Sequence, residues 1–133
     1  MDKTLENIKL ISEFQGIDYS DVIGMCKSEA YDAGYRDDVI IDNPAYWSCY
    51  HNSWNWLMPV VEEIEQNKKY FKKELQLNIT KYSVCWQTID NEAVILNSNV
   101  FHKYGTYAGV EKIQAVYKSV IDFIKWYNQQ NKS

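Results

Sequence analysis

Apolar residues recur at helical spacing in three separate segments of the chain. Residues 4–14 place Leu5, Ile8 and Ile11 three positions apart, and Gly16 follows as a stop signal. Residues 53–67 and 109–130 carry broader apolar stripes with charged residues between them. The pattern therefore predicts three helices. Pro59 leaves two options open in the second: a kinked first turn, or a regular helix that starts at the proline itself.

Residues 75–98 show the two-residue period of β-structure instead. Leu75, Leu77 and Ile79 alternate, and the alternation resumes on the opposite parity after Thr80-Lys81, which indicates a bulge or a turn there. Asp90-Asn91 lies between two further β-prone runs and predicts a hairpin. Residues 99–107 are expected to form a loop.

Together these elements predict an α+β fold that occupies residues 1–133 as one domain. We expect a small antiparallel sheet of three or four strands with a central hairpin, packed against three helices in an αββα-type sandwich. Residues 17–52 lack a clear period and are expected to form an irregular segment, with at most one helical turn between Ser28 and Asp32.

This irregular segment contains most of the acidic excess of the chain. Residues 1–50 hold ten acidic against four basic side chains, whereas residues 51–133 hold eight against ten. Tyr46, Trp47 and Tyr50 add an aromatic cluster immediately before the second helix. Aromatic side chains anchor many protein interfaces, and acidic ones favour a basic partner. We therefore predict a partner-binding surface, composed of Asp32, Arg36, Asp37, Asp38, Asp42, Tyr46, Trp47 and Tyr50.

The sequence contains no recognised motif for catalysis or cofactor binding. The two histidines, His51 and His102, have no metal-ligand spacing, the three cysteines include no CxxC pair, and no glycine-rich phosphate loop occurs. The most basic run, between Lys68 and Lys73, is short, so direct nucleic-acid binding is not expected. The sequence thus favours a non-enzymatic protein without a metal or cofactor. Unpaired cysteines and the absence of a signal peptide or membrane-spanning run predict a cytoplasmic location.

Two blocks of the sequence resemble a family of small proteins found in phages and prophages of Bacteroidetes-type bacteria. The first is YHNSWNWLMPVVEEIE, residues 50–65, and the second is VEKIQAVYKSVIDFIKWYNQQ, residues 110–130. Together with the first predicted helix, these blocks extend the resemblance over a little more than a third of the chain, and it brings no activity, cofactor or site residue with it. It implies a phage-type protein that works inside a bacterial host cell.

These observations lead to one main hypothesis for function and two alternatives. The main hypothesis is an inhibitor of a bacterial defence system, similar to an anti-CRISPR protein, that docks on a basic effector nuclease or its RNA complex. The first alternative is a protein that sequesters a small nucleotide signal. The second is an accessory or structural phage protein.

Overall fold

A computed structural model of the protein describes residues 3–34, 44, 47–66, 75–81, 83–88, 104–105 and 111–130. Within these ranges lie four helices, α1 (Thr4–Gln15), α2 (Tyr19–Asp32), α4 (Trp54–Gln66) and α5 (Lys112–Gln130). Three strands, β1 (Leu75–Ile79), β2 (Ser83–Thr88) and β3 (Tyr104–Gly105), form an antiparallel sheet in the order β1-β2-β3. The predicted α+β class is therefore confirmed.

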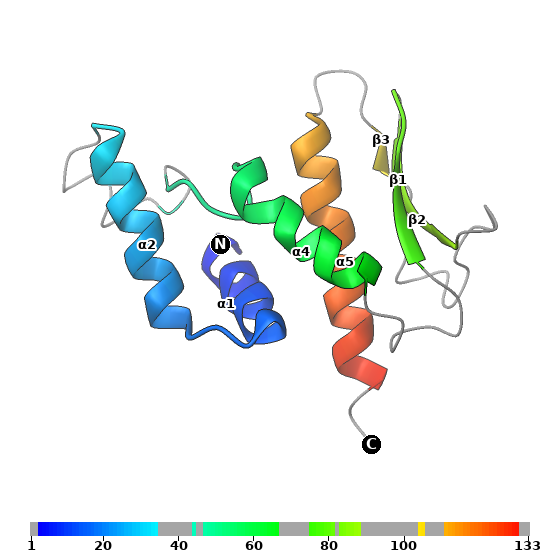
Figure 1. Ribbon diagram of the computed structural model, residues 1–133, viewed down its shortest axis with the longest axis horizontal. Helices are drawn as coiled ribbons and strands as arrows, with labels where there is room; N and C mark the ends of the chain where they lie inside the picture. The colour runs from blue at the N-terminus through cyan, green and yellow to red at the C-terminus, as the bar shows by residue number, and fades with distance from the viewer. Residues whose placement is uncertain are drawn as a thin grey trace.

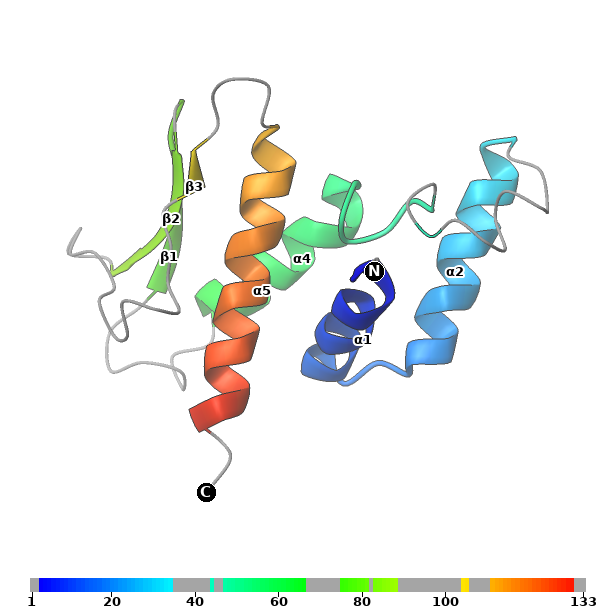
Figure 2. The same cartoon turned by 180° about the vertical axis from the view of Figure 1, so that it is seen from behind.

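The sheet lies at one end of the molecule, α4 and α5 lie beside it, and α1 and α2 follow at the other end (Figure 1). The turned view shows the same order of layers (Figure 2). Helix α5 contacts β2 and β3, whereas α4 contacts β1. The indole Nε1 of Trp86 donates a hydrogen bond of 2.9 Å to the buried carbonyl of Ser119, which ties β2 directly to α5.

The turn expected at Thr80-Lys81 is confirmed, because β1 and β2 form a hairpin that pairs Ile79 with Val84. The Thr80 amide donates to the Ser83 carbonyl at 2.8 Å, and the Ser83 amide donates to Thr80 Oγ1 at 3.0 Å. These bonds satisfy the polar backbone groups where the chain reverses. The second predicted hairpin, at Asp90-Asn91, lies outside the described residues. Strand β3 falls within the expected loop and was not predicted.

The helical predictions were correct for α1, α4 and α5 to within a few residues at either end. Helix α1 ends at Gly16, which has the left-handed backbone conformation (φ 74°) that a glycine adopts without strain. Helix α4 begins at Trp54 and continues through Pro59, so the regular helix does not start at the proline. Leu5 was expected on the apolar stripe of the first helix, but it is 40% exposed, so this detail was wrong. Trp54, expected on the stripe of residues 53–67, is likewise 42% exposed.

The main correction to the expected fold concerns residues 17–52. Instead of an irregular segment with a single helical turn, its first half forms the fourteen-residue helix α2. Val22, Cys26 and Ala30 recur every four residues on the buried side of this helix. This spacing was visible in the sequence, but the polar residues and Gly24 between them obscured it. Asp18 marks the start, where its carboxylate accepts a hydrogen bond of 2.8 Å from the Ser20 amide.

Candidate functional site

The structure separates the residues that were predicted to form one partner-binding surface. Asp32 is exposed in the last turn of α2. Trp47 and Tyr50, in contrast, retain only 3% and 1% of their surface accessible to solvent. These two aromatic residues belong to the hydrophobic core, so their prediction as interface anchors was wrong. The remaining candidates, Arg36, Asp37, Asp38, Asp42 and Tyr46, lie outside the described residues.

Tyr50 is buried because it joins α1 to α4. Its ring meets the ring of Trp56 edge-on at 5.4 Å, and its hydroxyl donates to Gln15 Oε1 at 2.5 Å. The Gln15 side chain also hydrogen-bonds the carboxyl group of Glu63, whose pKa is raised by burial. Burial likewise raises the pKa of Tyr50. This network gives the tyrosine a structural role.

Residues 47–50 form a support on which the inner face of α2 packs. Cys26 of α2 and Cys49 are fully buried, and their thiols share a hydrogen bond that raises the pKa of Cys26. The Lys27 ammonium group lies 5.5 Å from the centre of the Trp47 ring, a cation–π distance. On the side of α4, Trp56 Nε1 donates to Glu29 Oε2 at 2.7 Å. Contacts from α1, α4 and residues 47–50 thus fix which face of α2 remains exposed.

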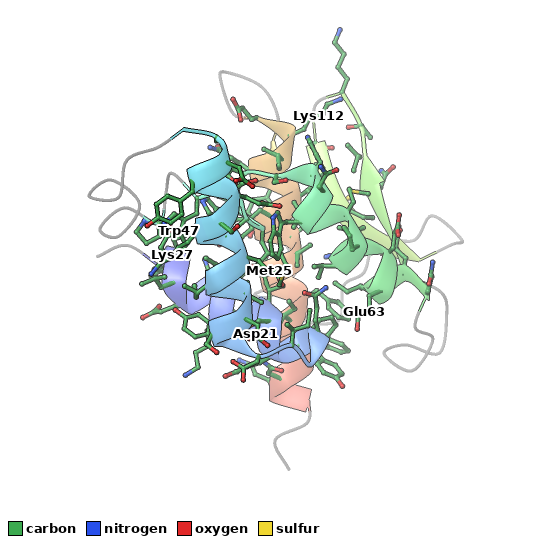
Figure 3. The ribbon with its side chains drawn as sticks, turned by 60° about the vertical axis from the view of Figure 1, so that its left-hand side comes forward. Asp21, Met25, Lys27, Trp47, Glu63 and Lys112 are labelled. Atoms are coloured by element: carbon green, nitrogen blue, oxygen red, sulfur yellow. The ribbon has the colours of Figure 1, made fainter. Side chains whose placement is uncertain are left out.

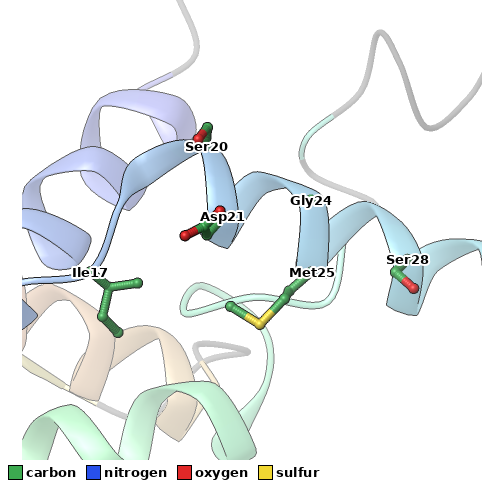
Figure 4. A pocket seen from close by; sticks show the side chains of 6 residues that line it. All are labelled: Ile17, Ser20, Asp21, Gly24, Met25 and Ser28. Atoms are coloured by element: carbon green, nitrogen blue, oxygen red, sulfur yellow. The ribbon is translucent and has the colours of Figure 1, made fainter.

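The exposed face of α2 and Ile17 together line a shallow, open groove with a volume of about 590 Å³. Figure 4 shows Ile17 and Met25 extending toward each other, with Asp21 between them and Gly24 leaving a gap in the row of side chains. Ile17 and Met25 are 38% and 47% exposed, which is high for large apolar residues. The residues that line the groove are Ile17, Ser20, Asp21, Gly24, Met25 and Ser28.

The charges around this groove have one predominant sign. Residues 17–34 contain four acidic side chains, Asp18, Asp21, Glu29 and Asp32, and one basic side chain, Lys27. Of the acidic ones, Glu29 faces α4 through its hydrogen bond with Trp56. Figure 3 shows Lys27 beside Trp47 on one flank of α2, away from Asp21. Hydrogen bonds from Ser20 hold the pKa of Asp18 below its usual value, which favours the charged form of this carboxylate. The outer face of α2 is therefore acidic with an apolar strip along it.

The sequence contained a signal for this site that the prediction did not use. Asp21, Met25, Ser28 and Asp32 follow one another at intervals of three or four residues, so a helix places them in one row. Recognising the row required recognising α2 as a helix. Three of the predicted residues are described, Asp32, Trp47 and Tyr50. Asp32 is the exposed one among them, and it lies on this face.

Comparisons with known protein families, with curated proteins and with solved structures found no match to this chain. Among the described residues, no group of three or more His, Cys, Asp or Glu side chains is arranged to hold a metal ion. None of the helices that the structure describes is both long enough and apolar enough to cross a membrane.

Proposed function

We propose that this protein functions by binding a basic partner protein through the outer face of α2. The observation that carries the proposal is the groove beside Ile17, Asp21 and Met25, on a helix whose exposed charges are predominantly acidic. Apolar side chains supply contact area, and methionine adapts its shape to different partners. Acidic neighbours accelerate the encounter with a basic surface and disfavour acidic competitors.

The partner we propose is an effector of bacterial defence, such as a CRISPR nuclease. Such a nuclease holds guide RNA and target DNA in positively charged channels, which an acidic protein complements. This partner class follows the expectation, drawn from the resemblance of residues 50–65 and 110–130 to phage proteins, of a protein that works inside a bacterial host cell. The docking surface differs from the one expected from the sequence, because Met25 and Ile17 take the place of the buried Trp47 and Tyr50.

The experiment combines the purified protein with candidate CRISPR nucleases and measures both complex formation and cleavage of target DNA. We expect co-elution on a sizing column and reduced cleavage, with affinity that decreases as salt increases. Asp32→Lys should weaken binding about tenfold, a loss of about 1.4 kcal/mol. Lysine suits the last turn of a helix, so this variant should remain folded.

Glu13→Lys is the matched control. Glu13 is exposed in the last turn of α1, so the substitution makes the same change in charge at an equivalent position of another helix. We expect its affinity to stay within about twofold of the unmodified protein. Equal weakening by both variants would mean that general charge, rather than the face of α2, governs association. Absence of both binding and inhibition would exclude the tested nucleases as partners.

A further inference from the structure

Two of the three cysteines meet in the core beneath α2. Cys26 belongs to the buried stripe of this helix, and Cys49 belongs to residues 47–50, on which the stripe packs. Both side chains are fully buried, and their thiols share a hydrogen bond. A hydrogen bond between thiols places the two sulfur atoms next to each other. The folded protein therefore holds a thiol pair, Cys26 and Cys49, that links two separate parts of the sequence.

Contacts on both sides of the thiol pair hold the two backbone segments together. The Lys27 ammonium group, adjacent to Cys26 in sequence, lies 5.5 Å from the centre of the Trp47 ring. The Cys49 amide donates to Asn52 Oδ1 at 2.9 Å, and Asn52 Nδ2 donates to the Trp47 carbonyl at 2.7 Å. These bonds fix the turn that carries Cys49. The fold thus meets the first requirement for a disulfide, which is that its two backbone segments lie side by side.

We infer that Cys26 and Cys49 are a site of reversible oxidation, at which hydrogen peroxide closes a disulfide that fastens α2 to residues 47–50. One thiol sulfur takes an oxygen atom from the peroxide as the O–O bond breaks, which forms a sulfenic acid and releases water. The other sulfur attacks the sulfenic sulfur, the S–S bond forms, and the hydroxyl group leaves as water with the second thiol proton. Two thiols and one peroxide molecule become one disulfide and two water molecules. This cross-link depends on the fold alone and not on the partner proposed above.

The position of the thiol pair makes its oxidation depend on opening of α2. The thiolate is the reactive form, and the hydrogen bond to Cys49 together with burial raises the pKa of Cys26, so this thiol keeps its proton while α2 is packed. The buried stripe of α2 is narrow, and weakly held elements open most readily. After such an opening and reclosure, the disulfide holds the helix covalently. Cys85 takes no part, because it lies half-buried on β2, and β2 and α2 are at opposite ends of the molecule (Figure 1).

The test treats the reduced full-length protein with hydrogen peroxide and then blocks the remaining thiols with iodoacetamide in denaturant. Intact mass counts the blocked thiols, and peptide mapping identifies the linked cysteines. In Cys85→Ala, which retains the thiol pair, we expect both thiols to disappear together without a dimer on a non-reducing gel. The oxidised variant should unfold about 5–15 °C above its reduced form, because the cross-link restricts the unfolded chain. Dithiothreitol should restore the lower unfolding temperature.

Cys26→Ala and Cys49→Ala are the complementary variants, and each should abolish the increase in unfolding temperature. Urea at concentrations below the unfolding transition should accelerate thiol loss in Cys85→Ala, because opening of α2 limits the reaction. Any of three results would overturn the proposed cross-link: retention of both thiols in Cys85→Ala under these conditions, a disulfide in the unmodified protein that involves mainly Cys85, or a Cys26–Cys49 disulfide that leaves the unfolding temperature unchanged. The measurements on Cys85→Ala decide the matter even if the two core variants fail to fold.

Discussion

Tyr50 stabilises the protein through its ring and its hydroxyl group, and the two contributions can be separated. Tyr50→Phe keeps the ring contact with Trp56 and removes the hydrogen bond to Gln15. We expect it to lower the free energy of unfolding by about 1 kcal/mol. Tyr50→Ala leaves a cavity in the core and should lower it by about 3–5 kcal/mol. Urea denaturation measures both values.

The exposed Trp54 provides the contrast for this measurement, since 42% of its surface is accessible to solvent. Trp54→Phe should change the free energy of unfolding by less than about 0.5 kcal/mol. If Tyr50→Ala were equally mild, Tyr50 would not be the core residue that its burial indicates, and a role at an interface would again be open.

Ionisation of two buried groups, Cys26 and Tyr50, and of the partly buried Tyr104 should make the protein less stable at alkaline pH. The pKa of Cys26 is raised by its hydrogen bond to Cys49 and by burial. Burial also raises the pKa of Tyr50 and of Tyr104, and for Tyr104 a hydrogen bond to Asp122 adds to the effect. The folded state therefore retains protons that the unfolded chain releases above about pH 8.5 for a thiol and about pH 10 for a phenol.

The sign of the pH dependence follows from these raised pKa values. Their stabilising contribution is complete below the unfolded-state pKa values and is lost as the pH rises through the folded-state values. We expect the free energy of unfolding to decrease above about pH 8.5 and to decrease more steeply above about pH 10. Cys26→Ala should reduce the first decrease only. A stability that is constant up to about pH 11 would contradict this assignment.

At the scale of the element, Gly24 allows a direct test of how α2 is stabilised. Gly24→Ala should raise the free energy of unfolding by about 0.5–1 kcal/mol, because alanine loses less freedom and meets no neighbour. Gly34→Ala is the control, since Gly34 has a positive φ of 93° that strains any other residue. It should lower the same quantity by about 1 kcal/mol. Thermal denaturation distinguishes a gain from a loss.

The elements differ in how far the sequence alone could predict them. Helices α4 and α5 carry broad apolar stripes because each buries a face against the sheet, and such stripes are easily recognised. Helix α2 packs mainly on α1 and residues 47–50, so its buried stripe is narrow. Three residues, Val22, Cys26 and Ala30, form this stripe, and the rest of the helix reads as a polar loop.

The same difference explains the errors at the candidate site. Acidic side chains indicated the half of the chain that contains the proposed surface, because charge is a property of composition. Whether Trp47 and Tyr50 are buried depends on α1, α2 and α4, which approach residues 47–50 from separate parts of the sequence. A local pattern contains no information about such contacts, so a dense aromatic segment predicted a surface where the fold places core.

At the scale of the whole molecule, Phe123 connects elements that the sequence holds far apart. Its ring lies 6.1 Å from Phe14 of α1 and 5.7 Å from Trp86 of β2, between centroids. The same ring stacks on Tyr127 at 6.4 Å. Helix α5 thereby joins the sheet to α1, and α1 in turn carries α2. Because this one ring packs against both the sheet and α1, we expect the sheet and the helices α1 and α2 to unfold together.

Phe123→Ala tests this coupling. Removal of a fully buried aromatic ring should lower the free energy of unfolding by about 3–5 kcal/mol, a large part of the 5–15 kcal/mol typical of a domain. Because the ring contacts α1 and β2, we expect far-ultraviolet circular dichroism and tryptophan fluorescence to shift to the same lower urea midpoint. Leu5→Ala, at an exposed position of α1, should leave both midpoints nearly unchanged. If the two signals shifted to different midpoints, the variant would not unfold in one step, which would contradict the coupling through Phe123.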